Sequence, residues 1–198
     1  NRIIDLVLPN TVTSIQTIKS GVKTLNISAS VTSVSDMTES ADLQDYKVDA
    51  NNANYCDVDG VLFSKDKKIL YSMPFGRNSQ ANYGYTIPEG TKEIGEYAFN
   101  KMTNLAKVVF PDGLEVIDLD AFAYCSGLLS VTLPAGLKKI NQGGFFQCTS
   151  LQTMTFPEGL EEIGEGAFRL CTSLTTVKFG EGLKTIKTIA FASCYALT

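Results

Sequence analysis

The 198-residue sequence contains no histidine and no tryptophan. The absence of histidine excludes the Ser-His-Asp and Cys-His pairs that activate nucleophiles, and it removes the usual histidine ligand of zinc sites. Lysine and arginine form no basic stripe and the formal net charge is −4, so we expect no nucleic-acid partner. No apolar run reaches the roughly 18 residues of a membrane-spanning helix, so we expect no membrane span.

The dominant feature that is present is a repeat of 23 residues. One proline, one phenylalanine and one leucine recur at this interval. The three columns are Pro88, Pro111, Pro134 and Pro157; Phe99, Phe122, Phe145, Phe168 and Phe191; and Leu105, Leu128, Leu151, Leu174 and Leu197. Such a fixed period is typical of a solenoid, in which each unit buries its apolar face only by stacking on its neighbours.

Each regular unit contains one segment with the character of a strand. Residues 128–133, 151–156 and 174–179 begin with leucine, carry valine or methionine at the fourth position and end in leucine or phenylalanine. This pattern predicts a short parallel strand whose side chains lie against their own copies in the next coil. The Ala-Phe segment of each unit is expected to form an irregular or 3₁₀-like coil on the outer side.

The spacing of the repeat divides the chain into three parts. Residues 1–45 follow the pattern loosely, and residues 88–198 follow it closely. Residues 46–87 interrupt it, and within them two apolar segments at 61–63 and 69–71 flank a polar tip, which predicts a β-hairpin. We expect degenerate repeats, a hairpin insertion and regular repeats in one continuous solenoid.

The regular unit also has a recognisable consensus. It reads Leu-Pro-x-Gly-Leu-x-x-Ile-Gly-x-x-Ala-Phe-x-x-Cys-x-x-Leu, and residues 158–174 match it almost throughout. This pattern resembles the BspA-like (Treponema pallidum type) leucine-rich repeat. The insertion adds to the likeness, because that family often carries an Asn-x-x-Tyr…Asp-Gly-Val-Leu-Phe/Tyr segment like residues 52–63. The resemblance implies a β-rich leucine-rich-repeat solenoid with a parallel β-sheet, wound as a right-handed superhelix.

The resemblance also implies a function. It points to a bacterial protein, secreted or displayed on the cell surface, that adheres to host matrix proteins or to other cells without catalysis. The alternative is a structural spacer that carries another domain away from the cell envelope. We expect the sequence to be a trimmed piece whose signal peptide lies outside it, since Asn1 opens abruptly and Thr198 falls inside a repeat.

Leucine-rich solenoids normally bind through the exposed face of their inner sheet. In this chain the positions between the buried columns form a nearly uncharged strip rich in threonine and serine. This candidate strip consists of Lys107, Val109, Ser130, Thr132, Thr153, Thr155, Thr176 and Lys178. Its hydroxyl groups favour a protein or glycan partner, although threonine is also simply a good exposed strand residue. Both interpretations stay open at this stage.

The insertion is dense in oxygen-bearing side chains, namely Asp49, Asn51, Asn52, Asn54, Asp57 and Asp59. These are the hard ligands that calcium prefers, but they also form the Asx turns that lead into hairpins. The spacing does not match an EF-hand loop and no glutamate closes it, so we assign no metal. Five tyrosines offer a second contact surface or simple packing: Tyr46, Tyr55, Tyr71, Tyr83 and Tyr85.

Four cysteines follow the repeat: Cys125, Cys148, Cys171 and Cys194. Structural zinc needs ligands that converge tetrahedrally on one point, whereas this column forms a row. Met102 occupies the first place of the column, which indicates a position of modest apolar volume. We therefore expect buried, reduced thiols, with disulfides between adjacent coils and a metal as the alternatives. No cofactor is expected.

One surface column alternates strictly in charge: Lys92, Glu115, Lys138, Glu161 and Lys184. On stacked coils each of these charges has opposite charges above and below it, which predicts ion pairs that set the register. A neighbouring column is acidic, with Glu89, Asp112, Glu158 and Glu181. We expect this acidic column to be a solvated edge, because a catalytic pair of carboxylates needs a cleft and no segment of the sequence predicts one. An enzyme is therefore not expected.

Overall fold

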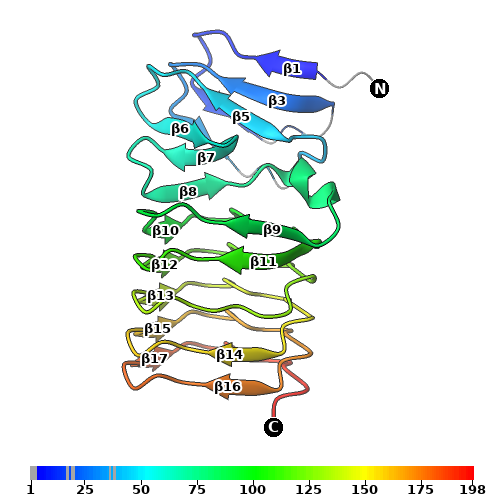
Figure 1. The fold of residues 1–198 in the computed structure, drawn as a ribbon, viewed down its shortest axis with the longest axis vertical. Helices are drawn as coiled ribbons and strands as arrows, with labels where there is room; N and C mark the ends of the chain where they lie inside the picture. The colour runs from blue at the N-terminus through cyan, green and yellow to red at the C-terminus, as the bar shows by residue number, and fades with distance from the viewer. Residues whose placement is uncertain (1–3, 17, 19–20, 36, 38) are drawn as a thin grey trace.

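The computed structural model describes residues 4–16, 18, 21–35, 37 and 39–198. The chain winds as a stack of flat coils from the N-terminus at one end to the C-terminus at the other (Figure 1). It is a parallel β-solenoid of about eight turns with a spacing of about 23 residues. The solenoid predicted from the repeat is thereby confirmed.

The longest sheet among the described residues has eight strands and runs along one side of the stack. Its regular part consists of two-residue strands: β10 (Glu93–Ile94), β12 (Val116–Ile117), β13 (Lys139–Ile140), β15 (Glu162–Ile163) and β17 (Thr185–Ile186). Each strand pairs in parallel with the same position of the next coil, as Ile94 does with Ile117. Two residues per coil are too few to give a periodic signal, so the sequence pattern did not predict these strands.

The segments predicted as strands lie on another side of the coils. There β9 (Tyr83–Thr86) pairs in parallel with β11 (Leu105–Val109), and β14 (Thr153–Thr155) with β16 (Thr176–Lys178). Residues 128–133 are joined to this side by a single bridge between Ser130 and Thr153. The predicted strands are therefore present at 151–156 and 174–179 and reduced to one bridge at 128–133.

The Ala-Phe segment of each coil is irregular, as predicted, but it consists of successive turns and not of a 3₁₀ helix. Its alternate amides donate to the next coil: the amide of Phe122 to the carbonyl of Gly144 at 2.9 Å, and that of Phe145 to Ala167 at 2.8 Å. Positive φ angles make this possible, including 63° at Tyr124. The segment thus has a backbone ladder of its own, which ties adjacent coils together outside the sheets.

The insertion is built into the stack and does not project from it. β7 (Val61–Ser64) and β8 (Ile69–Ser72) form the predicted hairpin, and β6 (Tyr55–Val58) adds a further antiparallel strand. β8 also pairs in parallel with β10, so Leu70 lies beside Ile94 in the isoleucine column. A short 3₁₀ helix, η1 (Phe75–Ser79), then leads from β8 to β9. The insertion therefore supplies a coil on which the regular repeats stack.

The N-terminal repeats have a separate, smaller core. β1 (Ile4–Val7), β3 (Val22–Ile27) and β5 (Asp45–Val48) form a parallel three-stranded sheet, and β2 (Ser14–Ile15) pairs with β4 (Ser33–Val34). Strand β7 joins this core to the larger one, because its successive side chains point to opposite faces. Leu62 belongs to the N-terminal core, whereas Val61 and Phe63 belong to the larger core.

The larger core is a set of stacked columns, of which the phenylalanines are the bulkiest. Phe99, Phe122, Phe145, Phe168 and Phe191 stack face to face, with successive centroid distances of 4.8, 5.2, 5.3 and 5.3 Å. These distances follow the spacing of adjacent coils, close to the roughly 4.8 Å between neighbouring strands. Each ring therefore buries its faces against its own copies.

We expect Phe145→Ala to lower the free energy of unfolding by about 3–5 kcal/mol, because it removes a buried ring between two others and leaves a cavity. Denaturant unfolding measures this loss. Phe179→Ala is the control: that ring stacks on Phe156 but is 50% exposed, so its removal should cost much less. Equal losses in the two variants would contradict the stacked-core interpretation.

Candidate binding surfaces

The candidate strip lies on one face of the solenoid, and all eight of its residues are exposed. Val108, Val131 and Met154 alternate with strip residues and are buried, so each strand directs one side to the core and the other to solvent. The register places Thr153 beside Thr176 and Thr155 beside Lys178. The part of the strip from Ser130 to Lys178 is joined by backbone pairing, whereas β11, which carries Lys107 and Val109, pairs with β9 instead. The role of the strip in binding stays a prediction.

The hydroxyl groups at the centre of this strip are available to a ligand. Residues of the strip and its floor, namely Ser130, Val131, Thr132, Leu133, Thr153, Thr155 and Pro157, line a shallow hollow of about 380 Å³. Within the part of the chain that the structure describes, no side-chain hydrogen bond engages the hydroxyls of Thr132, Thr153 or Thr155. By contrast, the hydroxyl of Thr175 donates to the carbonyl of Gln152 at 3.0 Å.

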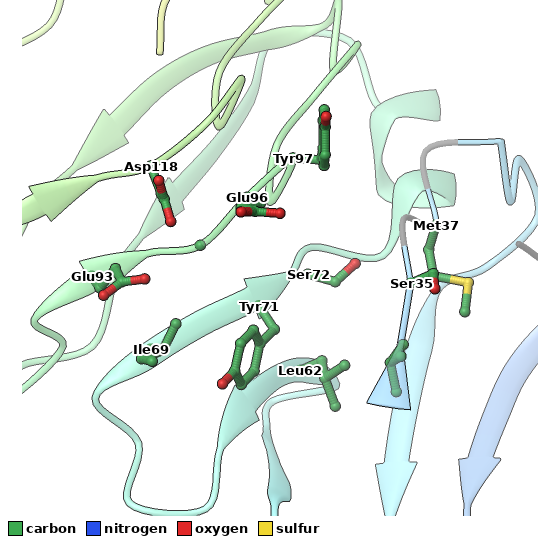
Figure 2. Close-up of a pocket in the computed structure, with 12 residues that line it drawn as sticks. Ser35, Met37, Leu62, Ile69, Tyr71, Ser72, Glu93, Glu96, Tyr97 and Asp118 are labelled. Carbon is green, nitrogen blue, oxygen red and sulfur yellow. The ribbon is translucent and has the colours of Figure 1, made fainter. Parts of the chain in front are cut away.

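A second concave surface, which we call the junction groove, lies where the insertion meets the first regular coils. It has a volume of about 530 Å³. Leu62, Ile69 and Tyr71 form its apolar wall, and the ring of Tyr71 packs edge-on against Tyr55 at 5.4 Å. Figure 2 shows the Tyr71 ring in the groove, between Leu62 and the carboxylates described next.

The other wall of the junction groove is acidic and consists of Glu93, Glu96 and Asp118 (Figure 2). The pairing of β8 with β10 sets Glu93 beside Ile69, and Gly95 leaves room above the Tyr71 ring, whose Cδ1 atom would lie 3.5 Å from an added Cβ. Burial raises the pKa of Glu93, and the like charges of Asp118 and Glu96 raise that pKa further. Lysine and arginine are absent from the described residues that line the groove.

Sequence reasoning identified Tyr71 in this groove but missed the rest. The three carboxylates occupy different positions of the repeat, so no single column reveals them. Their association depends on the parallel pairing of β8 with β10. The sequence of residues 69–72 does not predict that pairing. The visible signal was an acidic residue, Asp118, at a position of the repeat where the later coils carry Asn141, Gly164 and Lys187.

The cysteine column is buried and its thiols are free, as predicted. Each Sγ donates to a phenylalanine carbonyl of the preceding coil, for example from Cys125 to Phe99 at 3.1 Å and from Cys148 to Phe122 at 3.2 Å. Burial raises the pKa of Cys171 to about 12. Across the described ranges, no group of three His, Cys, Asp or Glu side chains is placed to hold a metal ion.

The oxygen-bearing side chains of the insertion form the expected Asx turns. Asp49 accepts a hydrogen bond from the amide of Asn51, and Asn52 accepts from the amides of Asn54 and Tyr55. The buried Asn52 also donates to the carbonyl of Ser28 at 2.8 Å. These contacts fix the chain entering β6, and they engage the side-chain oxygens of Asp49 and Asn52, two of the six residues in the calcium interpretation.

The five tyrosines of the insertion differ in exposure. Tyr46 and Tyr55 are buried, and Tyr83 and Tyr85 pack against the larger core. Tyr71 is 38% exposed. Packing therefore accounts for four of the five, and Tyr71 is the one that presents its ring in a groove.

The alternating surface column forms two of the predicted ion pairs, and Lys138 lies within ion-pair distance of neither neighbouring glutamate. Lys92 lies 2.8 Å from Glu115, and Lys184 lies 2.8 Å from Glu161. These lysines lower the pKa of their glutamate partners, and Lys138, between the two glutamates in the column, lowers both further. All of these charges are well solvated, so they act mainly on register and little on stability.

Comparisons with known proteins agree with this architecture. The family model described as "BspA type Leucine rich repeat region" matches residues 75–198 in six copies. The pneumococcal vaccine antigen PcpA is 26% identical with a TM-score of 0.75, over 90% of this chain and 46% of that one. A leucine-rich repeat protein from Eubacterium ventriosum is 26% identical with a TM-score of 0.73, over 98% of this chain and 59% of that one.

A third solved structure, a leucine rich cell surface protein from Faecalibacterium prausnitzii, shares the fold at 22% identity and a TM-score of 0.63, over 86% of this chain and 52% of that one. The chain thus spans about half the length of each of these three structures. A search of the curated proteins finds no match. Among the described residues there is no helix with the length and hydropathy of a membrane span.

We expect Cys56 to react fastest with a thiol reagent in the native protein, because it is half-buried while the four column cysteines are buried. Burial raises the pKa of all five thiols, so the difference in reactivity comes from access of the reagent. Titration with Ellman's reagent measures this, and all five thiols should react once the chain is denatured. Cys56→Ala should remove the fast phase. If more than one thiol of the native protein reacted in the fast phase, the cysteine column would be accessible to solvent.

We expect Glu93→Gln to stabilise the fold at neutral pH. The pKa of Glu93 is higher in the folded chain than its ordinary value of 4.5, so ionising this side chain destabilises the fold. The loss of stability is absent below pH 4.5 and develops as the pH rises through the pKa of the folded state. Thermal unfolding between pH 3.5 and pH 8 tests this, and the variant should lose its advantage at the acid end.

Glu162→Gln is the matched control for that experiment. Glu162 occupies the same repeat position as Glu93, but Lys187 lies 2.8 Å away and lowers its pKa. The control should therefore change stability at neutral pH in the opposite direction, by a small amount because the pair is partly solvated. The same sign of change in both variants would contradict the electrostatic account of the junction groove.

Proposed function

The chain belongs to the BspA type leucine-rich repeat family, and from that premise we propose that it is a non-enzymatic binding module of a secreted or cell-surface bacterial protein. We propose further that it recognises a protein or a glycan through the candidate strip. The observation that carries this proposal is the strip itself, a set of exposed side chains whose central hydroxyls have no partner among the described residues.

The geometry of the strip suits recognition of a polar, extended surface. A hydroxyl group both donates and accepts hydrogen bonds, so a regular array of them can engage glycan hydroxyls or the backbone of a protein partner. Thr153, Thr155 and Thr176 of the array are held by the paired strands β14 and β16, and Met154 between the first two is buried in the core. Little conformational freedom would therefore be lost on binding.

A location at the cell surface fits the family and its relatives. The pneumococcal relative is described as a vaccine antigen, and the relative from F. prausnitzii as a cell surface protein. We extend a surface or extracellular location to this chain on that basis. Adhesion to host matrix proteins or to other cells is the corresponding role, and a spacer that carries another domain is the alternative.

We expect a variant with Thr132, Thr153, Thr155 and Thr176 changed to glutamate to lose any binding that the native chain shows. The reason is that four added carboxylates at the centre of the strip cost free energy to desolvate against any partner and also repel an acidic one. The measurement is a binding screen against matrix proteins and glycans. Thr153→Ala should leave thermal unfolding nearly unchanged, since its side chain is exposed.

A second quadruple variant controls for the added charge. It carries glutamate at four exposed positions outside the strip: Thr103, Gln142, Thr185 and Thr188. Binding lost in the strip variant and kept in this control would support the proposal. Binding lost equally in both would indicate a general effect of charge. A folded native chain that binds nothing in the screen would favour the spacer.

A further inference from the structure

We propose that the junction groove is a docking site for a lysine or arginine side chain presented by an extended segment of a partner protein. This site is separate from the candidate strip. The groove lies beside β8 and β10 of the eight-stranded sheet, whereas the strip lies along β11, β14 and β16 on the other side of the coils (Figure 1). The inference therefore does not depend on what the strip binds.

The repeat itself supplies a comparison for the acidic wall of the groove. Glu162 and Lys187 lie three repeats of 23 residues beyond Glu93 and Asp118, in the same two positions. At the later site the glutamate and the lysine form an ion pair of 2.8 Å. At the groove a second carboxylate stands where the lysine would be, so two acidic groups face each other. None of the described side chains that line the groove supplies the cation that this geometry accommodates.

The surroundings of these carboxylates make the binding of a cation more favourable. Glu93 is half-buried, and its neighbours Asp118 and Glu96 raise its pKa beyond the effect of burial. Asp118 is partly satisfied, because its Oδ1 accepts hydrogen bonds from the side chain of Asn141 at 2.6 Å and the amide of Leu119 at 2.8 Å. Among the described residues Glu93 has no such donor, and a bound cation would supply one.

The apolar wall indicates that the cation arrives on a hydrocarbon stem. Leu62, Ile69 and Tyr71 lie opposite or beneath the carboxylates, and the groove of about 530 Å³ is far larger than a single ion needs (Figure 2). Lysine and arginine side chains bury their methylene groups on apolar surface while their charged heads engage carboxylates. The Tyr71 ring adds a face for a cation–π contact.

The acidic groups do not form a metal site. Within the described residues, no three of them converge as ligands. The charge of the groove and the apolar surface beside it are together complementary to an amphipathic cation. An extended protein segment fits best, because the groove is open and adjoins a sheet whose outer face carries further polar side chains, such as Asn141 and Glu162.

The first experiment uses the 198-residue chain and short peptide probes. The probe is an acetylated, amidated pentapeptide, Gly-Leu-Arg-Leu-Gly, and its twin replaces arginine with citrulline, which has nearly the same shape without the charge. We expect saturable changes in the NMR amide signals of Gly95 and Tyr71 with the arginine peptide at millimolar concentration. The citrulline twin should bind at least about tenfold more weakly, because it lacks the charge-assisted hydrogen bonds.

Two variants assign the effect to the groove. Glu93→Gln with Glu96→Gln should weaken binding by about tenfold, while Asp112→Asn with Glu181→Gln removes the same charge from exposed sites elsewhere and should leave binding unchanged. Asp118→Lys installs the cation found at the later site. It should abolish binding of the arginine peptide while the chain remains folded.

Several results would overturn the proposal. These are equal binding of the citrulline twin, an equal loss in the charge-matched control, unchanged binding to Asp118→Lys, or no saturable change around Gly95. Methylguanidinium that binds as tightly as the arginine peptide would also overturn it, since the site would then take a free cation and not a protein segment. None of these outcomes bears on the strip, whose screen uses different variants.

Discussion

The regular repeats of this structure depend on the parallel stacking of one coil on the next. The strands of the eight-stranded sheet and the turns of the Ala-Phe segment both bond each coil to its neighbour. This places each side chain against its own copy at about the strand spacing. Phenylalanine gains from such a neighbour because its ring stacks on its own copy, and each column cysteine gains because its thiol donates to a phenylalanine carbonyl of the preceding coil. A charged side chain loses, unless the next coil carries the opposite charge, and the column from Lys92 to Lys184 alternates accordingly.

The same constraint explains what the sequence could predict. The columns of phenylalanine, leucine and cysteine recur at one spacing, so the solenoid, the buried thiols and the exposed strip followed from the repeat alone. The two-residue strands ending at Ile94 and Ile117 did not, because a strand that short leaves no alternating pattern. The hairpin was predictable from its apolar segments, but its pairing with β10 was not, since that depends on contacts between residues far apart in the chain.

The two candidate surfaces differ in their relation to the repeat. The strip forms where the repeat is regular, because successive coils present similar side chains at the same positions. The junction groove is the repeat interrupted, where the insertion replaces a standard coil and Asp118 replaces the cation seen at Lys187. A regular surface can be predicted from the sequence, because residues at the same position of successive repeats lie beside one another. The groove required the structure, because Leu62, Tyr71 and Glu93 come together only after β8 has joined the stack.

Strand β7 has a consequence for the mechanics of the protein. Its successive side chains enter two cores, Leu62 the N-terminal one and Val61 and Phe63 the larger one. A pulling force applied at the N-terminus would therefore be transmitted through β7 into the regular coils and would not simply peel off the first repeats. Under such a force the insertion would act as the joint that transmits load between the N-terminal repeats and the regular repeats.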